Sequence, residues 1–134
     1  MVLKASIDEL EKLLDWLADI FTEYSCPGKV CNQIAVITEE VFVNIAKYAY
    51  DGRTGDAIVR VGRSGRIMVM QFIDTGKYFN PLEKTDPDIS ADIDERDIGG
   101  LGIYMTKKWM DSIHYDRVNG ENRLTLRKNI AAPE

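Results

Sequence analysis

The sequence is poor in the residues that build disulfide frameworks and metal centres. It has 134 residues, of which two are cysteine and one is histidine. Cys26 and Cys31 are five residues apart, a spacing that matches neither a C-x-x-C redox pair nor a zinc ligand set. His114 has no second histidine to join it. These absences argue against thiolate or imidazole metal chemistry and suit a reducing compartment.

Long hydrophobic runs and an excess of basic charge are also missing. The longest apolar runs have four residues, whereas a membrane-spanning helix needs about 20. Acidic residues interrupt any secretion-signal core near the N-terminus, at Asp8, Glu9 and Glu11. The net charge of −5 argues against generic nucleic-acid binding, because that requires a basic surface. We therefore expect a cytoplasmic protein with no membrane span and no direct nucleic-acid contact.

What is present is the composition of one folded domain, which we place at residues 1–134. Hydrophobic residues make up 45% and charged residues 29% of the chain, a balance that is typical of a globular domain. The negative charge is concentrated at residues 82–97, where seven acidic residues stand against two basic ones. Such a run is usually a solvated loop. It lies within a polar stretch from Asp74 to Gly100, whose length and lack of apolar period favour a functional lid or disorder.

The pattern of apolar residues predicts the secondary structure. Their spacing indicates helices at residues 6–24, 29–50 and 101–110. Two hairpins are expected, with strands at 57–63 and 66–73 around Ser64-Gly65, and at 113–117 and 123–128 around Asn119-Gly120. Because the strands can pair through hairpins, we expect an α+β two-layer sandwich. Its sheet would be mixed but mostly antiparallel, and helices would cover one face.

The second predicted helix carries a polar pair on one face. Glu40 and Asn44 are four residues apart and therefore stack on the helix surface, near the apolar residues Val36 and Val41. A carboxylate in apolar surroundings is costly unless a partner, a metal ion or a proton compensates it. The pair therefore either has a structural role or faces a ligand, and its spacing does not decide between the two.

Two further motifs combine polar residues with glycine. Asp74 ends a predicted strand and is followed by Gly76, which is usually just a turn. The alternative is a carboxylate that accepts a hydrogen bond from a ligand, with Gly76 permitting close approach. Residues 99–102 lead into a predicted helix, whose first N–H groups can hold phosphate. The Gly-Lys-Ser/Thr of a P-loop is missing, and these glycines also suit a purely conformational role.

In combination, these motifs resemble a known family. The segments E-E-V-F-V-N (39–44), D-T-G-K-Y-F-N-P (74–81) and G-G-L-G-I (99–103) resemble the N-box, G1-box and G2-box of the Bergerat-type ATP-binding fold. That fold is shared by gyrase, heat-shock ATPase chaperones, histidine kinases and MutL-type repair proteins. The compact length and the closing N-R-L-T-L-R-K (122–128) resemble the anti-sigma factor serine-protein kinases. The resemblance spans about Ala5 to Lys128.

The resemblance implies a role for each matching residue. Glu40 would be the general base, Asn44 the magnesium ligand, and Asp74 the acceptor for the exocyclic amine of adenine. ATP and Mg²⁺ are the implied cofactors, and residues 82–98 would form the ATP lid. The residues implied to bind the nucleotide are Asn44, Asp74, Gly76, Phe79, Gly99, Gly100, Leu101, Gly102 and Thr125. Tyr48 and Tyr78 depart from the family pattern, which often has His and Gly there.

The resemblance also implies a function. The chain would be an anti-sigma regulatory factor and serine/threonine protein kinase that phosphorylates an anti-sigma factor antagonist in a partner-switching system. A sigma factor would be a second partner, and the family resemblance suggests a homodimer. The alternative is a non-catalytic binding module, in which the nucleotide only stabilises the conformation that sequesters a sigma factor or another regulator.

Overall fold

A computed structural model describes residues 1–83 and 105–131 of the protein. Within these ranges the helices and strands follow one another in a simple order. They are β1 (Val2–Lys4), a 3₁₀ turn (Ile7–Glu9), α1 (Leu10–Glu23), α2 (Gly28–Asn44), a π-helical turn (Ile45–Ala49), β2 (Asp56–Ser64), β3 (Ile67–Asp74), a second 3₁₀ turn (Pro81–Glu83), β4 (Ser112–Val118) and β5 (Glu121–Asn129). Residues 105–109 are also helical.

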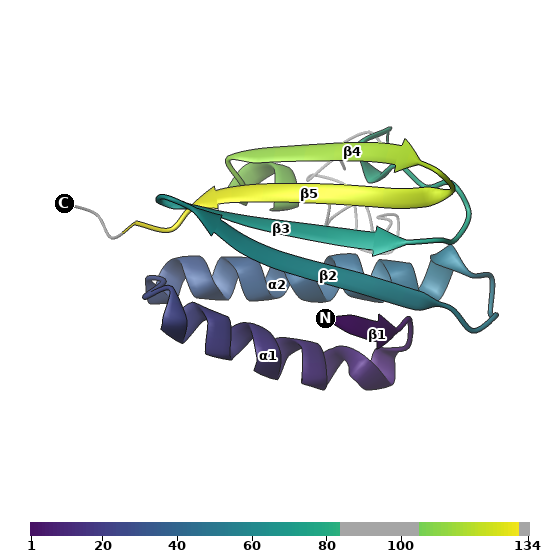
Figure 1. The fold of residues 1–134 in the computed structure, drawn as a ribbon, viewed down its shortest axis with the longest axis horizontal. Coiled ribbons are helices and arrows are strands. Elements are labelled where there is room, and N and C mark those ends of the chain that lie inside the picture. The colour runs from purple at the N-terminus through teal and green to yellow at the C-terminus, as the bar shows by residue number, and fades with distance from the viewer. Residues whose placement is uncertain (84–104, 132–134) are drawn as a thin grey trace, which may run out of the picture.

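The strands form one five-stranded sheet in the order β1-β2-β3-β5-β4. Both long helices run along the same side of this sheet (Figure 1). The predicted α+β two-layer sandwich is thus confirmed. All four pairings among the described strands are antiparallel, so this sheet is not mixed. Strand β1 was not predicted, because three residues are too few for a period-2 pattern and only pairing with β2 makes them a strand.

The core lies between the helices and one face of the sheet. Leu13 and Leu17, one turn apart on α1, are fully buried, as is Phe42 on α2. On the sheet, Val59 pairs with Phe72, so side chains from neighbouring strands meet on the covered face. Leu124 of β5 pairs with the same Phe72, and all three side chains are buried. The covered face therefore consists of alternate residues of each strand, as the period of 2 requires.

The second predicted helix changes its geometry at its C-terminal end. The α-helical part ends at Asn44, and the next five residues form a π-helical turn. Single π turns are rare and occur frequently at functional sites. The chain then leaves the helix through Asp51 and Gly52, which both have positive φ. The carbonyl of Ala49, the last π-helical residue, accepts a hydrogen bond of 2.9 Å from the backbone N–H of Lys77.

Both predicted hairpins are confirmed. Gly65 turns the first with a φ of 60°. In the second, Asn119 and Gly120 have φ values of 51° and 79°, and positive φ at both central residues is what a type I′ turn requires. The helix predicted for residues 6–24 instead begins as a 3₁₀ turn. Ser6 caps that turn by accepting from the N–H of Asp8 at 3.3 Å.

The two cysteines flank the start of α2. Pro27 is the N-cap residue, which places Cys26 just before the cap and Cys31 in the first turn, the two positions of a hydrophobic staple. The Cys31 thiol donates to the carbonyl of Cys26 at 3.2 Å. Burial, reinforced by the neighbouring Cys31, raises the pKa of the Cys26 thiol to about 12. The Cys26 thiol therefore stays protonated at neutral pH and contributes packing at the helix start.

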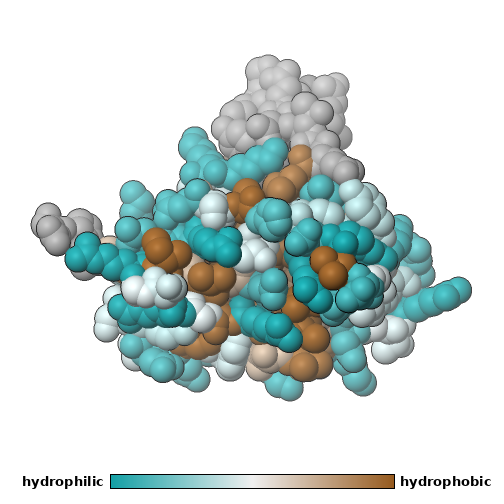
Figure 2. Space-filling view, turned by 45° about the horizontal axis from the view of Figure 1, so that its top comes forward, coloured by the Kyte–Doolittle hydropathy of each residue, from teal (hydrophilic) through white to brown (hydrophobic). Residues whose placement is uncertain are grey.

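Exposed apolar side chains are scattered over the surface. Large exposed ones in the described ranges include Val2, Ile7 and Val36. On the face shown in Figure 2, hydrophobic patches are separated by hydrophilic side chains, and apolar residues scattered in this way are ordinary on a protein surface. None of the helices in residues 1–83 and 105–131 has the length and apolar character needed to span a bilayer.

Candidate nucleotide site between helix α2 and the sheet

A recess opens between the C-terminal end of α2, the π-helical turn and the covered face of the sheet. It encloses about 500 Å³ of empty space, with its open mouth included. The helical segment and the sheet contribute about equally, and the segment after β3 adds Phe79 and Pro81. The lining residues are Val41, Asn44, Ile45, Tyr48, Ala49, Phe72, Asp74, Phe79, Pro81, Tyr115, Asn122 and Leu124.

Asp74 places a carboxylate in this largely apolar recess. It is the last residue of β3, and its side chain is only 6% exposed. Its Oδ1 accepts hydrogen bonds from the N–H of Gly76 and from Nδ2 of Asn122, both at 2.9 Å. Its Oδ2 accepts none from any described residue. The turn expected from sequence is therefore present but uses one oxygen, and the other is available to a ligand.

Asn44 places a second unsatisfied polar group in the recess. It is the last residue of α2, and its half-buried side chain makes no hydrogen bond within the described part of the chain. Glu40 lies one turn earlier on the same face of α2, also half-buried, but outside the set of lining residues. Val36, a further turn back, is 51% exposed, so the surroundings of Glu40 are less apolar than its neighbours in sequence indicate.

Gly76 lacks a side chain for a reason within the protein. A Cβ at this position would lie 2.2 Å from the carbonyl oxygen and 2.6 Å from the carbonyl carbon of Ala49. The glycine therefore lets the loop after β3 pack directly on the end of the π-helical turn. Its lack of a side chain serves this contact between helix and loop, whereas the sequence pattern indicated close approach to a ligand.

Replacement of Gly76 by alanine is expected to destabilise the protein by about 1–3 kcal/mol, because the added methyl must displace backbone atoms. The control is Gly62→Ala, where an added Cβ meets no atom within 4 Å. Denaturant unfolding of both variants measures the difference. Equal stabilities for the two variants would show that the contact with Ala49 relaxes without cost.

Asn122 of β5 is the hydrogen-bond hub beside Asp74. Its side-chain oxygen accepts from Tyr115 Oη at 2.6 Å, from Arg117 Nη1 at 3.1 Å and from the N–H of Phe79 at 3.4 Å. The residue is 5% exposed. It connects the loop after β3 to both strands of the second hairpin.

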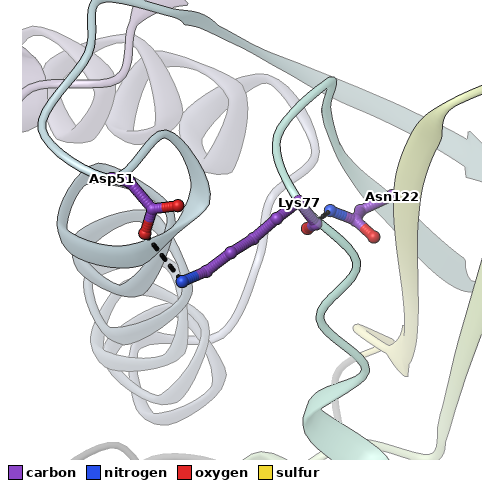
Figure 3. Close-up of polar contacts among 3 residues, drawn as sticks. All are labelled: Asp51, Lys77 and Asn122. Carbon is purple, nitrogen blue, oxygen red and sulfur yellow. Dashed lines mark hydrogen bonds and ion pairs between the residues drawn. The ribbon is translucent and has the colours of Figure 1, made fainter.

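The amide nitrogen of Asn122 completes this hub. It donates to Oδ1 of Asp74 at 2.9 Å and to the backbone carbonyl of Lys77 at 2.8 Å. Figure 3 shows Lys77 between two partners: its backbone carbonyl faces Asn122, and its side chain reaches Asp51 at the helix end. The Lys77–Asp51 ion pair measures 2.7 Å, but both side chains are more than half exposed, so it contributes little to stability.

Three aromatic residues near the recess take different positions. Phe79 and Tyr48 line it, and Tyr48 is 47% exposed at its mouth. Tyr78 is 53% exposed and packs edge-on against Tyr115, with ring centroids 5.8 Å apart. Tyr78 is not among the lining residues, so it leaves the room beside Asp74 open.

The structure does not bring Thr125 to this site. Leu124 and Leu126 on either side of it face the core, and Thr125 pairs with Gln71 on the opposite face of the sheet. Its hydroxyl accepts a hydrogen bond from Gln71 Nε2 at 3.2 Å. The residue of β5 that does reach Asp74 is Asn122, which the sequence interpretation missed. The signal was present, since Asn122 shares the two-residue alternation of the buried leucines.

Part of the predicted site lies outside the described residues. This applies to Gly99, Gly100, Leu101 and Gly102, and to the predicted lid beyond Glu83. Within the described ranges, no cluster of three or more histidine, cysteine, aspartate or glutamate side chains is arranged to hold a metal ion. The amide oxygen of Asn44 is nevertheless a suitable single ligand for Mg²⁺, which usually keeps several waters and takes phosphate oxygens.

Comparison with known proteins agrees with this architecture. Residues 3–128 match the histidine kinase-like ATPase domain family. The serine/threonine-protein kinase BtrW of Bordetella bronchiseptica is 24% identical over 122 residues, which cover 90% of this chain and 85% of BtrW.

Solved structures show the same fold. The histidine kinase domain of the Erythrobacter litoralis EL346 blue-light activated histidine kinase has a TM-score of 0.56 at 16% identity, over 78% of this chain and 46% of that one. A structure of the blue-light activated kinase itself has the same TM-score and identity, with 32% of its chain covered. This chain therefore spans less than half of either structure. The match over residues 3–128 shows that it belongs to the histidine kinase-like ATPase domain family.

Proposed function

We propose that this protein binds Mg-ATP in the recess and is a serine/threonine protein kinase that phosphorylates an anti-sigma factor antagonist. The observation that carries the proposal is the pair of unsatisfied polar groups in the recess. Asp74 Oδ2 and the Asn44 amide have no hydrogen-bond partner in the described chain, although both side chains are at least half-buried. Neither group is among the buried side-chain atoms that lack a partner in the described chain, and both residues line the recess, so a ligand that enters it can pair with both.

The chemistry of the recess fits an adenine nucleotide. Its apolar walls, among them Phe72, Leu124 and Phe79, suit a flat base. Asp74 Oδ2 suits the amine of adenine, since a carboxylate only accepts hydrogen bonds. Asn44 lines the same recess and would hold the magnesium ion that accompanies the phosphates. The relative named as a serine/threonine-protein kinase supports the same class of ligand.

Glu40 supplies the proposed acid–base step. It would accept the proton of the acceptor serine or threonine hydroxyl as that oxygen bonds to the γ-phosphorus and the bond from the γ-phosphorus to the β-phosphate oxygen breaks. The products are a phosphorylated acceptor and ADP. The position of Glu40 one turn before Asn44, outside the lining of the base recess, favours contact with the acceptor.

Thermal unfolding with and without Mg-ATP tests the nucleotide site. ATP at about 100 times its dissociation constant should stabilise the wild type by roughly 2.7 kcal/mol. Asn44→Ala should respond much less in the presence of Mg²⁺, because the metal contact is lost. The control, Asn32→Ala, removes an exposed asparagine of the same helix and should respond as the wild type does. A wild type that does not respond to Mg-ATP would refute the nucleotide site.

Phosphotransfer to the antagonist protein distinguishes the kinase from a non-catalytic binding module. Transfer of labelled γ-phosphate from ATP to a serine or threonine of the purified antagonist supports the kinase. ATP-dependent binding of a sigma factor without any transfer would support the binding module instead.

A further inference from the structure

We propose that Asn122 is a positioning residue that makes the recess selective for a base bearing an exocyclic amine. The inference rests on the proposed nucleotide binding and adds to it the residue that sets base specificity. Asp74 is the group that would touch the base, and Asn122 acts through it.

The orientation of the Asn122 amide follows from its five partners. The hydroxyl, guanidinium and backbone N–H on one side all donate, and the carboxylate and the carbonyl on the other side both accept. Exchange of the amide oxygen and nitrogen would bring NH₂ against three donors, so only one orientation satisfies the network. At 5% exposure, water cannot readily replace these partners. The Nδ2–H therefore points at Asp74 as a fixed donor.

This donor decides which oxygen of Asp74 remains available. Oδ1 is occupied by Asn122 and by the N–H of Gly76, at 2.9 Å each. Two donors on one oxygen fix the rotation of the Asp74 carboxylate. Oδ2 then remains as a hydrogen-bond acceptor for a ligand in the recess that Asp74 lines. Adenine carries an amine at the position where guanine carries a carbonyl oxygen. An acceptor held in place binds the amine and repels the carbonyl, because polar groups buried without a partner are costly.

Arg117 keeps the arrangement rigid. Its Nη1 contacts both the side-chain oxygen of Asn122, at 3.1 Å, and the backbone carbonyl of Gly76, at 2.9 Å. It therefore connects the hub to the loop residue that supplies the second donor to Asp74. The base-reading carboxylate is thus held from β5, from β4 and from its own loop.

The test replaces Asn122 by aspartate, which keeps the shape of the side chain, removes the donor and adds a negative charge at pH 8. At pH 8 two carboxylates then face each other across the former hydrogen bond, and Asp74 is repelled from its position. We expect the affinity for Mg-ATP to fall about tenfold or more relative to the wild type, with a smaller preference for ATP over GTP. Isothermal titration with each nucleotide measures both quantities.

The pH profile separates positioning from a merely structural role. Two carboxylates in contact share a proton at a raised pKa, and the shared proton supplies the O–H donor that replaces Nδ2–H. The affinity of N122D relative to the wild type in the same buffer should therefore recover between pH 8 and about pH 5.5. Among the described residues, the titratable groups beside the pair are Arg117 and Tyr115 from β4, which contact Asn122, and Tyr48 from the π-helical turn, which lines the same recess. Lys77 contacts Asn122 through its backbone carbonyl, and its side chain pairs with Asp51 instead. None of the groups beside the pair is a histidine or another carboxylate, so the introduced pair is what titrates.

The outcomes distinguish the inference from the proposed function. A wild type that binds neither nucleotide refutes the function itself. A wild type that binds ATP, with an N122D variant of equal affinity and selectivity, overturns the role of Asn122. A loss that is the same at every pH also overturns it, because that is the behaviour of simple misfolding.

Two further variants complete the experiment. Asn129→Asp makes the same charge change at an exposed position of the same strand and should leave both affinities unchanged. If N122D does not fold at pH 8, Asn122→Ser takes its place, since the shorter side chain withdraws the donor without adding charge. A wild-type ratio of ATP to GTP affinity in that variant would overturn the inference.

Discussion

Asparagine in place of Asp74 is expected to lower the affinity for Mg-ATP about 100-fold, because a charge-assisted hydrogen bond is lost and a donor then faces the donor on the base. The substitution preserves the turn, since an amide oxygen at the Oδ1 position still accepts from Gly76 and Asn122. Folding should therefore change little while the affinity for Mg-ATP falls. Isothermal titration with Mg-ATP measures the loss, and circular dichroism checks the fold.

The matched control for this variant is Asp51→Asn. Asp51 carries the same charge and follows the π-helical turn, but its side chain is 67% exposed and, among the described residues, pairs with Lys77 alone. Its positive φ of 49° is a conformation that asparagine also tolerates. We expect wild-type affinity for this control. Equal losses in the two variants would attribute the effect to net charge and remove Asp74 from the base site.

Glutamine in place of Glu40 is expected to lower phosphotransfer by roughly 10²- to 10⁴-fold, because the general base is lost. ATP affinity should stay near the wild-type value, since Glu40 does not line the recess. Transfer of labelled phosphate to the antagonist measures the first quantity, and isothermal titration the second. A rate loss without a binding loss is the expected signature of a residue that acts in the chemical step.

Glu39→Gln is the control at the adjacent position. Glu39 is exposed, on a different face of α2, and its loss should leave the transfer rate unchanged. If Glu40→Gln transfers phosphate as fast as the wild type, another residue is the base. If the wild type itself transfers no phosphate but retains ATP-dependent binding of a regulator, the binding-module interpretation replaces the kinase.

Much of the fold could be predicted because the signals are local. The second hairpin followed from Asn119-Gly120, whose positive φ values are what the turn demands. Leu13 and Leu17 marked the buried face of α1 through their spacing alone. Strand β1 could not be predicted in this way, because its three residues become a strand only through pairing with β2.

The polar residues of the site could be predicted from sequence, but the residue that hydrogen-bonds and positions Asp74 could not. Asp74 and Asn44 were identified from motifs, and the structure brings both to one recess. Thr125 was assigned to the same site, but the register of β5 against β3 turns it to the opposite face. Asn122 occupies the site instead, because residues an odd number of positions apart on a strand point to opposite faces of the sheet. Register depends on the pairing of distant strands, so the final motif alone did not decide it.

The sequence by itself determined the layers, the turns and the chemical character of the site, because these depend on periodicity and on residue type. Only the tertiary structure decided how the site is held together. Gly76 is required by the carbonyl of Ala49, 27 residues earlier in the sequence. Asp74 owes its single free oxygen to Asn122, 48 residues later. Such contacts join segments that are distant in the chain, and no local pattern encodes the point at which two distant segments meet.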